Sequence, residues 1–209
     1  MTETRIVRDE EVIAVAKRLF AALGYDGTSL AQIAESAGTD VASVNERFGG
    51  KRELYIEVMK RTHTDFQGAM DKVMRQYADA DPVTKVHGRL DGLVDFFASH
   101  PDNTRLWMHR WLADAADVGD LERMYTQPLI RVIIEDIAAT LGLDPNDEKV
   151  DLETTVSSFV WCLNGFGTAG LLGEHSEKLD FADPEASRRF RAFLHRMAHH
   201  LIGLPGDPP

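Results

Sequence analysis

Apolar residues recur along this chain at three- and four-residue intervals, and glycine or proline ends most of the runs. The first run contains Val12, Ala16 and Phe20, and Gly24 follows it. A repeat near 3.6 residues is typical of helices that bury one face, whereas a half-buried strand alternates with a period of two. No alternating stretch is long enough to build a sheet. The chain is therefore expected to be all-α, with roughly nine helices: three short ones followed by a larger bundle.

Local signals predict where the short helices begin and end. Ser29 and Gln32 have the spacing of a capping box at the start of the second helix, and Gly38 suits its end. The other expected boundaries are Thr39 or Asp40 for the start of the third helix, Gly49-Gly50 for its end, and Lys51 for the start of a longer helix.

Proline marks the expected starts of four later helices, because its missing N–H is harmless in a first helical turn. These starts are Asp81-Pro82, His100-Pro101, Asp144-Pro145 (followed by the acidic Asp147 and Glu148) and Asp183-Pro184. Pro128 indicates a kink, or a restart after Thr126. The last two helices are expected over 152–172 and 185–203, with 204–209 as a flexible tail.

The net charge of −11 is spread unevenly, which matters because phosphate repels an acidic protein. Residues 1–62 hold 9 Lys/Arg against 10 Asp/Glu, a net of −1; the remaining residues hold 14 against 24, a net of −10. The nearly neutral N-terminal part therefore permits contact with DNA. The single Cys162 fits a reducing compartment, and neither a signal peptide nor a membrane-spanning apolar run is found, so a cytoplasmic protein is expected.

Three short helices, the last two joined at Gly38, suit a helix-turn-helix, whose second helix enters the major groove of DNA. Val44 and Phe48 form the apolar inner edge of that helix. Its other residues are mostly small or form hydrogen bonds, and asparagine pairs well with adenine and arginine with guanine. The residues predicted to contact DNA are Ser29, Thr39, Val41, Ala42, Ser43, Asn45, Arg47 and Lys51. Spacing alone leaves a purely architectural turn as the alternative.

Residues 12–58 resemble the N-terminal domain of the tetracycline-repressor (TetR) family. The matching strings are VIAVAKRLFAALGYDGTSLAQIAESAG and VASVNERFGGKRELYIEVM, which carry the motifs A-x-x-L-F, G-Y-x-x-T-S, I-A-x-x-A-G and F-x-x-K-x-x-L-Y. The resemblance implies a dimeric, ligand-responsive DNA-binding protein, usually a repressor, with a divergent helical C-terminal domain. On this basis we expect a DNA-binding domain over 1–50, a connecting helix over 51–80, and a ligand-binding and dimerisation domain over 81–203.

The chain departs from the family pattern where DNA would bind. The usual Leu-Tyr of the third helix is Val44-Asn45, so a tyrosine that contacts phosphate in the family is missing, and Glu46 adds an acid. More of the affinity must then depend on Arg47 and Lys51. Binding is expected to be strongly sensitive to salt or modest in affinity.

Aromatic residues gather in the C-terminal part, where they either fill the core or line an apolar ligand pocket. Trp107 and Trp111 are four residues apart and share a helix face. The resemblance implies an effector site in this part without locating it, and the effector is expected to be small and largely apolar. The residues expected to line the site are Phe96, Trp107, Met108, Trp111, Phe159, Cys162 and Asn164, with Arg105 and His109 as further polar candidates.

Each of the last two helices carries an apolar stripe, and in the family these helices pair with their symmetry mates as a four-helix bundle. The residues expected at a homodimer interface are Val156, Val160, Leu163, Phe190, Phe193, Leu194, Met197 and Leu201. Packing within one chain alone is the alternative. His195, His199 and His200 suggest a metal site superficially, but a third ligand is not evident, so they are expected to be solvated and no metal or cofactor is predicted.

No nucleophile elbow, P-loop, dinucleotide fingerprint or zinc motif occurs in the sequence, so an enzyme is not expected. The expected function is a ligand-responsive transcriptional regulator that binds a palindromic operator in double-stranded DNA as a homodimer, with no membrane partner. The alternative is a regulator that retains the fold but acts through a protein partner, with weak DNA binding or none.

Overall fold

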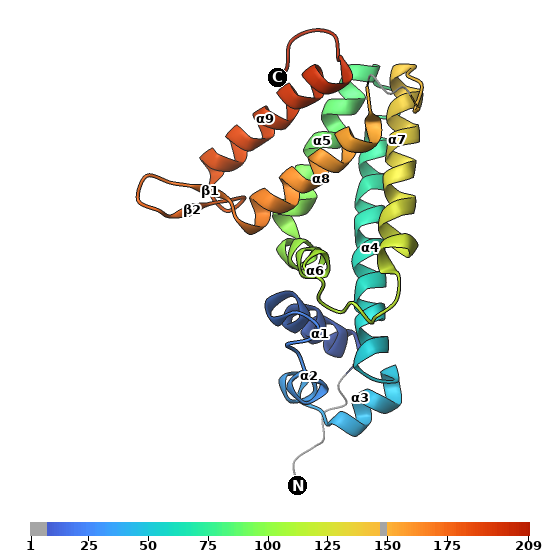
Figure 1. The fold of residues 1–209 in the computed structure, drawn as a ribbon, viewed down its shortest axis with the longest axis vertical. Coiled ribbons are helices and arrows are strands. Elements are labelled where there is room, and N and C mark those ends of the chain that lie inside the picture. Colours follow the sequence, from blue (N-terminus) through green and yellow to red (C-terminus); the bar gives the residue numbers. More distant parts are fainter. Residues whose placement is uncertain (1–7, 147–149) are drawn as a thin grey trace. The chain divides into compact units, whose positions relative to one another are not determined.

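The computed structural model describes residues 8–146 and 150–209, and this part contains nine α-helices, a π-helical turn and a short hairpin (Figure 1). The elements are α1 (Asp9–Leu23), α2 (Leu30–Ala37), α3 (Val41–Phe48), α4 (Lys51–Gln76), α5 (Pro82–Ser99), α6 (Pro101–Trp111), η1 (Glu122–Thr126), α7 (Gln127–Leu141), α8 (Leu152–Thr168), β1 (Leu171–Leu172), β2 (Lys178–Leu179) and α9 (Pro184–Ile202). The predicted all-α class is confirmed.

Most of the predicted helix boundaries are confirmed. The Ser29 hydroxyl oxygen accepts a hydrogen bond from the Gln32 N–H, while the Gln32 side chain accepts one from the Ser29 N–H, so the capping box is complete. Gly38 ends α2 and Gly49 ends α3, both with left-handed backbone that favours glycine. Pro128 lies in the first turn of α7, directly after η1, which is the predicted restart.

Two predictions about the C-terminal helices are wrong. No helix begins at Asp144-Pro145, where the Asp144 carboxylate instead accepts a hydrogen bond from the Asn146 N–H in a turn. (Asp147 and Glu148 lie outside the described residues.) The helix expected over 152–172 ends at Thr168, because Gly170 adopts a φ of 67°. Leu171 and Leu172 then pair with Leu179 and Lys178 in an antiparallel hairpin.

The chain divides into two compact units. Unit 1 spans Met1–Thr64 and Asp102–Leu121, and unit 2 spans Asp65–Pro101 and Glu122–Pro209. This division differs from the expected boundaries in that α6 and the loop after it group with the N-terminal helices. It also falls within α4, whose first part belongs to unit 1.

The core of unit 1 fixes the three short helices against the start of α4. Tyr55 of α4 is almost fully buried and contacts Phe20 of α1 edge-on, with 5.0 Å between ring centroids. Ile33 of α2 and Val44 of α3 are fully buried. Burying such side chains stabilises the fold by about 1.5–3 kcal/mol each, which exceeds what a short helix gains on its own.

Hydrogen bonds from α6 and its loop to the end of α1 explain why they group with the N-terminal helices. The Asp114 carboxylate accepts hydrogen bonds from the N–H groups of Tyr25 (2.6 Å) and Asp26 (2.9 Å). His109 lies 3.2 Å from the Ala21 carbonyl oxygen. The Arg110 guanidinium donates to carbonyls within the loop, at Ala115 and Gly119. The partners of Asp114 and His109 are about 90 residues away in sequence, so no local pattern predicts them.

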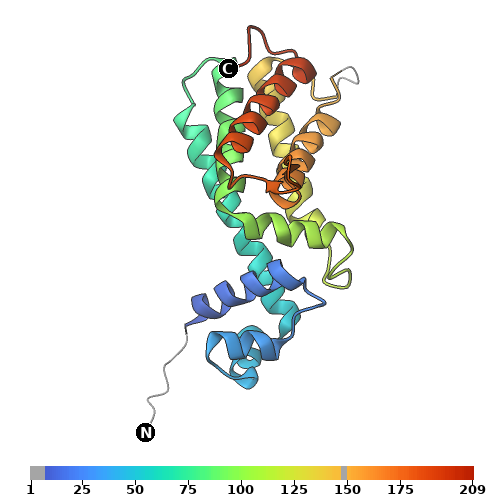
Figure 2. The same ribbon diagram turned by 90° about the vertical axis from the view of Figure 1, so that its left-hand side faces the viewer.

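Unit 2 is built around α5, α8 and α9, with α7 beside them (Figure 2). Its core contains Val94 of α5, Leu163 of α8 and Leu194 of α9, all fully buried. Phe166 and Phe190 stack at 4.1 Å between ring centroids. None of the helices over 8–146 and 150–209 combines the length and the apolar content needed to cross a bilayer.

Candidate nucleic-acid interface

The outer side of α3 presents small and hydrogen-bonding side chains. Val41, Ala42 and Asn45 are exposed, whereas Val44 is fully buried in the core of unit 1 and Phe48 is half-buried. The predicted inner and outer edges therefore lie on opposite sides of the helix. Because short outer side chains let the backbone approach base edges, this face has the form that major-groove recognition requires.

The start of α3 is fixed by Asp40. Its carboxylate accepts hydrogen bonds from the N–H of Ser43 (2.8 Å) and from the Ser43 hydroxyl (2.9 Å). These hydrogen bonds hold the pKa of the Asp40 carboxyl below its ordinary value, the backbone N–H having the larger effect. Thr39 and Ser43 are half-buried beside this cap, and Ser29 is exposed at the start of α2.

Arg47 is held by an acid that sequence reasoning did not connect with it. Its guanidinium donates two hydrogen bonds to the Asp9 carboxylate at the start of α1, and it also lies 5.5 Å from the centre of the Phe48 ring. Only a quarter of the Arg47 side chain is exposed. To reach a base, the guanidinium must leave Asp9. No sequence signal reveals this pairing, because the two residues are 38 positions apart.

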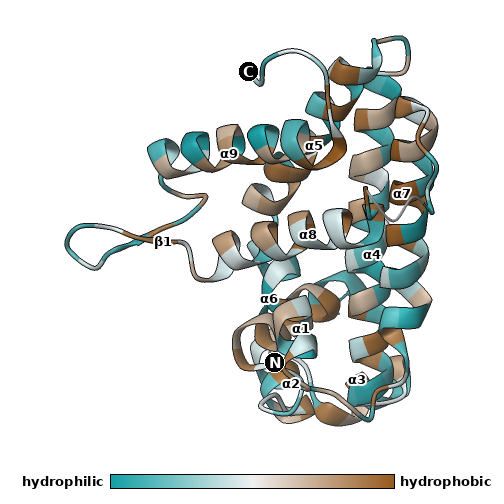
Figure 3. Ribbon diagram, turned by 45° about the horizontal axis from the view of Figure 1, so that its top comes forward, coloured by the Kyte–Doolittle hydropathy of each residue, from teal (hydrophilic) through white to brown (hydrophobic). Residues whose placement is uncertain are grey.

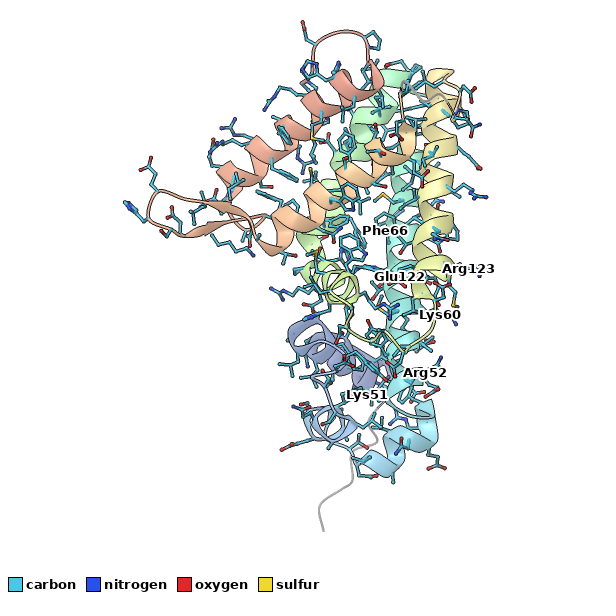
Figure 4. The ribbon with its side chains drawn as sticks, in the orientation of Figure 1. Lys51, Arg52, Lys60, Phe66, Glu122 and Arg123 are labelled. Carbon is cyan, nitrogen blue, oxygen red and sulfur yellow. The ribbon has the colours of Figure 1, made fainter. Side chains whose placement is uncertain are left out.

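Lys51 and Arg52 occupy the first turn of α4, next to the end of α3 (Figure 4). The Lys51 ammonium lies 4.1 Å above the centre of the Tyr25 ring, a cation–π contact. Arg52 is exposed. The two cations can therefore meet phosphate, although the exposed carboxylates of Asp40 and Glu46, at the start and in the second half of α3, oppose an anion.

The residues predicted to line an effector site fall in both units. Trp107, Met108 and Trp111 belong to α6 in unit 1, where Trp111 is exposed and the other two are half-buried. Phe96, Phe159, Cys162 and Asn164 belong to unit 2.

Within unit 2, the predicted effector residues are engaged with neighbours. Phe96 is buried against Phe66 of α4, with the rings perpendicular at 5.0 Å, and it stacks on His100 at 4.3 Å. Phe159 is part of the core, and burial raises the pKa of the Cys162 thiol. The buried Asn164 amide donates to the Val160 carbonyl of its own helix.

The structure narrows the predicted dimer surface. Leu163, Phe190 and Leu194 belong to the core of unit 2, and Val156 is also buried, so these four side chains are not available to a partner. Val160 and Met197 are half-buried. Two of the predicted residues remain on the surface, Phe193 (44% exposed) and Leu201 (43% exposed), together with the unpredicted Trp161 (59% exposed). The apolar stripes of α8 and α9 therefore pack mainly within their own chain, and Figure 3 shows hydrophobic and hydrophilic residues mixed along both helices.

The histidines of α9 differ from the prediction that they are solvated. His195 is buried, with 3% of its surface exposed, and lies 2.9 Å from the Asp91 carboxylate of α5. His199 is half-buried and contacts His87, also on α5. Only His200 of the three is exposed. Sequence reasoning could have used the i, i+4 spacing within each helix. His87 and Asp91 have this spacing on α5, and Arg191, His195 and His199 have it on α9.

A comparison with known protein families gives a match for the N-terminal helices. The sequence profile of bacterial regulatory proteins of the tetR family matches residues 12–58, which run from α1 to the start of α4. The chain is 24% identical to the HTH-type transcriptional repressor AcnR of Corynebacterium jeikeium, over 84% of this chain and 90% of that protein.

The fold is also found in solved structures. A TetR-like transcriptional regulator from Rhodococcus sp. RHA1 superimposes with a TM-score of 0.64 at 19% identity, covering 96% of this chain and 98% of that one. The fatty acid degradation regulator FadR from Bacillus halodurans gives a TM-score of 0.59 at 16% identity, covering 88% and 93%. At these identities the likeness shows a shared fold.

Proposed function

Because the chain belongs to the TetR family of bacterial transcriptional regulators, we propose that it is a repressor that binds a palindromic operator as a homodimer and leaves it when a small, largely apolar effector binds. The observation that carries the proposal is α3, a capped helix whose inner edge is buried and whose outer edge is small and polar. The outer side of such a helix contributes nothing to the core of unit 1, so the core does not explain its small and polar side chains.

The proposed contacts divide into two kinds. Asn45 and Arg47 read base edges, and Val41 or Ala42 meets a thymine methyl group. Lys51, Ser29, Thr39 and Ser43, together with the N–H groups at the start of α2, hold the phosphate backbone. With few cations on this face, each lysine or arginine carries a large share of the affinity, so binding weakens steeply with added salt.

A palindrome requires two copies of α3 about 34 Å apart, one turn of the DNA helix. We therefore propose that α8 and α9 pair with the same helices of a second chain through Trp161, Phe193 and Leu201, with Val160 and Met197 beneath them. These side chains are apolar and exposed or half-buried. An isologous contact between copies would remove them from water.

The effector acts by preferring a dimer whose two DNA-binding units have the wrong spacing. Within unit 1, α6 carries Trp107 and Met108, and the loop after it is hydrogen-bonded through Asp114 to the end of α1. A ligand that displaces α6 therefore pulls on the helices that carry α3. The loss of DNA affinity cannot exceed the preference of the effector, about 1–3 kcal/mol for a typical coupling.

Selection from random DNA duplexes at low salt tests DNA recognition. A palindromic motif with half-sites one helical turn apart is expected, and its affinity should fall linearly with salt on logarithmic axes. Lys51→Ala should weaken binding about equally on all sequences and reduce the slope by about 1. Lys60→Ala, an exposed lysine farther along α4, is the control and should leave the slope unchanged. A Lys51 variant with unchanged affinity and slope removes that residue from the proposed contacts.

One observation favours the alternative, a regulator that acts through a protein partner. Arg47 is engaged by Asp9, and Asp40 and Glu46 place negative charge at the start and in the second half of α3. If selection at low salt enriches no motif while the purified protein still forms a dimer, this alternative is preferred. Enrichment of a motif that is lost on replacing Asn45 and Arg47 excludes it.

A further inference from the structure

Five polar side chains meet between α5 and α9 inside unit 2. His87 and His199 face each other with 3.0 Å between their Nε2 atoms. His195 Nε2 lies 2.9 Å from Asp91 Oδ1, and the His87 and His195 rings are 4.8 Å apart, edge to face. The Arg191 guanidinium donates to the same Asp91 oxygen at 2.8 Å. We call these five residues the histidine cluster.

When the three rings are neutral, their hydrogen-bond partners determine which nitrogen of each ring carries the proton. His199 Nδ1 lies 3.1 Å from the Leu204 carbonyl oxygen, which can only accept, so His199 carries its proton on Nδ1. Its Nε2 is then an acceptor, and His87 must donate from Nε2. The His195 ring donates from Nε2 to the Asp91 carboxylate, which leaves its Nδ1 without a proton. That nitrogen is buried and has no hydrogen-bond partner within the described part of the chain.

Further protons disturb the cluster at two places. Two protons on both His87 and His199 would place two N–H groups head to head at 3.0 Å, whereas a single added proton leaves one donor and one acceptor across this contact. A proton on His195 Nδ1 would create a buried donor without an acceptor, which is unfavourable by about the free energy of a lost hydrogen bond. The contacts of the cluster are therefore those of three neutral rings.

We propose that the histidine cluster is a pH-sensitive link between α5 and α9, which holds α9 in place at neutral pH and releases it as His87 becomes protonated. Because α9 carries Phe193 and Leu201 of the proposed dimer surface, acidification would also weaken the dimer. This second consequence rests on the proposed function, whereas the release of α9 does not.

The charged groups around the cluster give the direction of the effect. Burial lowers the pKa of His87, and the electrostatic effects of His195 and His199 lower it further, against the opposite effects of Asp91 and Asp81. Burial raises the pKa of the Asp91 carboxyl, but the hydrogen bonds and charges of Arg191 and His195 outweigh it and hold that pKa below its ordinary value. Asp91 therefore stays ionised throughout the range in which His87 titrates. Arg191 is further bound to Asp95 at 2.5 Å.

The depressed pKa of His87 determines how stability changes with pH. The unfolded chain takes up a proton near the ordinary histidine pKa of 6.5, while folded His87 takes it up only at lower pH. The stabilisation is thus fully present above about pH 6.5 and is lost as the pH falls from there to the folded pKa. The one proton of His87 changes the opening equilibrium by up to about tenfold for each pH unit in that interval.

Hydrogen exchange of the full-length chain between pH 7.5 and 5.5 tests the proposal. After correction for the intrinsic pH dependence of exchange, the amides of α9 should open more at pH 5.5, by up to about tenfold, whereas α1 to α3 should not change. His87→Gln keeps an N–H donor at the same place but cannot be protonated, so it should remove most of this difference. His200→Gln, on the exposed side of α9, is the matched control and should behave as the unmodified chain.

Nitrogen NMR of the histidine rings in the unmodified chain gives a second test that does not depend on any variant folding. At pH 7.5, His199 should be found as the Nδ1–H form, and His87 and His195 as the Nε2–H form. A different assignment, or α9 exchange with the same pH dependence in H87Q as in the unmodified chain, overturns the proposal. Light scattering at pH 7.5 reports on the dimer separately: a monomer there contradicts the proposed function and leaves the exchange and NMR tests of the link intact.

Discussion

At the residue scale, Arg47 is an example of a side chain that is proposed to contact DNA but is bound by an acidic side chain of its own protein. An exposed ion pair such as Arg47 with Asp9 is worth about 0–1 kcal/mol, so binding to DNA can readily replace it. When Arg47 moves away to bind DNA, the Asp9 carboxylate would nevertheless remain close to the DNA phosphates. Asp9 is therefore expected to oppose DNA binding in two ways, by competing for the guanidinium and by repelling phosphate.

Asp9→Asn should therefore strengthen DNA binding. The asparagine removes one negative charge and holds Arg47 less firmly, and we expect an increase in affinity of roughly threefold to tenfold at low salt. Fluorescence anisotropy with the selected operator measures it. Asp71→Asn, an exposed acid in the part of α4 that belongs to unit 2, is the control for the change in net charge. An unchanged affinity for the Asp9 variant would show that the ion pair does not restrain recognition.

At the element scale, α3 depends on its ends because it has only 8 residues. Isolated helices of that length are not stable in water, so the cap at Asp40, the glycine at its C-terminal end and the buried Val44 together keep it formed. The same cap places a negative charge where DNA is proposed to bind. The Asp40 carboxylate is therefore expected to stabilise α3 and to weaken the binding of DNA.

Two substitutions at Asp40 separate the cap from the charge. Asparagine caps as well as aspartate, so Asp40→Asn should leave the melting temperature nearly unchanged while strengthening DNA binding. Asp40→Ala removes the cap and should lower the melting temperature by about 2–4 °C. Calorimetry and anisotropy on both variants make the comparison. Equal melting temperatures for the two would mean that the cap contributes little to α3.

The contact between α4 and α5 in unit 2 gives a further test at this scale. A Cβ added at Gly92 would lie 2.5 Å from a methyl carbon of Val73, and this β-branched side chain has little freedom to move away. Gly92→Ala should therefore lower the free energy of unfolding by about 1–3 kcal/mol. At Gly68 of α4 nothing lies within 4 Å, and Gly68→Ala should instead raise it by about 0.5–1 kcal/mol. Urea denaturation that gives the same sign for both would contradict this packing.

At the scale of the whole molecule, the proposed repressor requires two chains. The four interface candidates buried in unit 2 cannot join them, which leaves the face marked by Trp161, Phe193 and Leu201. A charge placed there would have to be buried in the dimer at a cost of several kcal/mol. The same charge would not disturb the fold of the single chain, because the side chain at position 193 is exposed there.

Phe193→Asp should therefore convert the dimer to a folded monomer and abolish tight operator binding. Size-exclusion chromatography with light scattering at micromolar concentration measures the mass, and circular dichroism checks the helical content. Val132→Asp, at an exposed valine of α7, is the control and should remain dimeric. A Phe193 variant that is still dimeric would place the interface elsewhere.

The sequence by itself determined the helices of the N-terminal part and the face of α3. Caps, glycines with left-handed backbone and the 3.6-residue apolar repeat act over a few neighbouring residues, so Ser29 with Gln32, Gly38, Asp40 and Val44 could be interpreted locally. The same signals failed at Asp144-Pro145, where the aspartate caps a turn rather than a helix. An Asp-Pro pair permits a helix to start but does not require one.

Only the tertiary structure decided which partners distant residues have. Phe193 and Leu194 are equally apolar neighbours in sequence, yet one is exposed and the other is fully buried, because the orientation of α9 is set by α5 and α8 together. His195 is buried against Asp91 for the same reason. Burial and pairing across about 100 positions depend on how whole helices pack, and a helical repeat specifies that a face is apolar without specifying what will cover it.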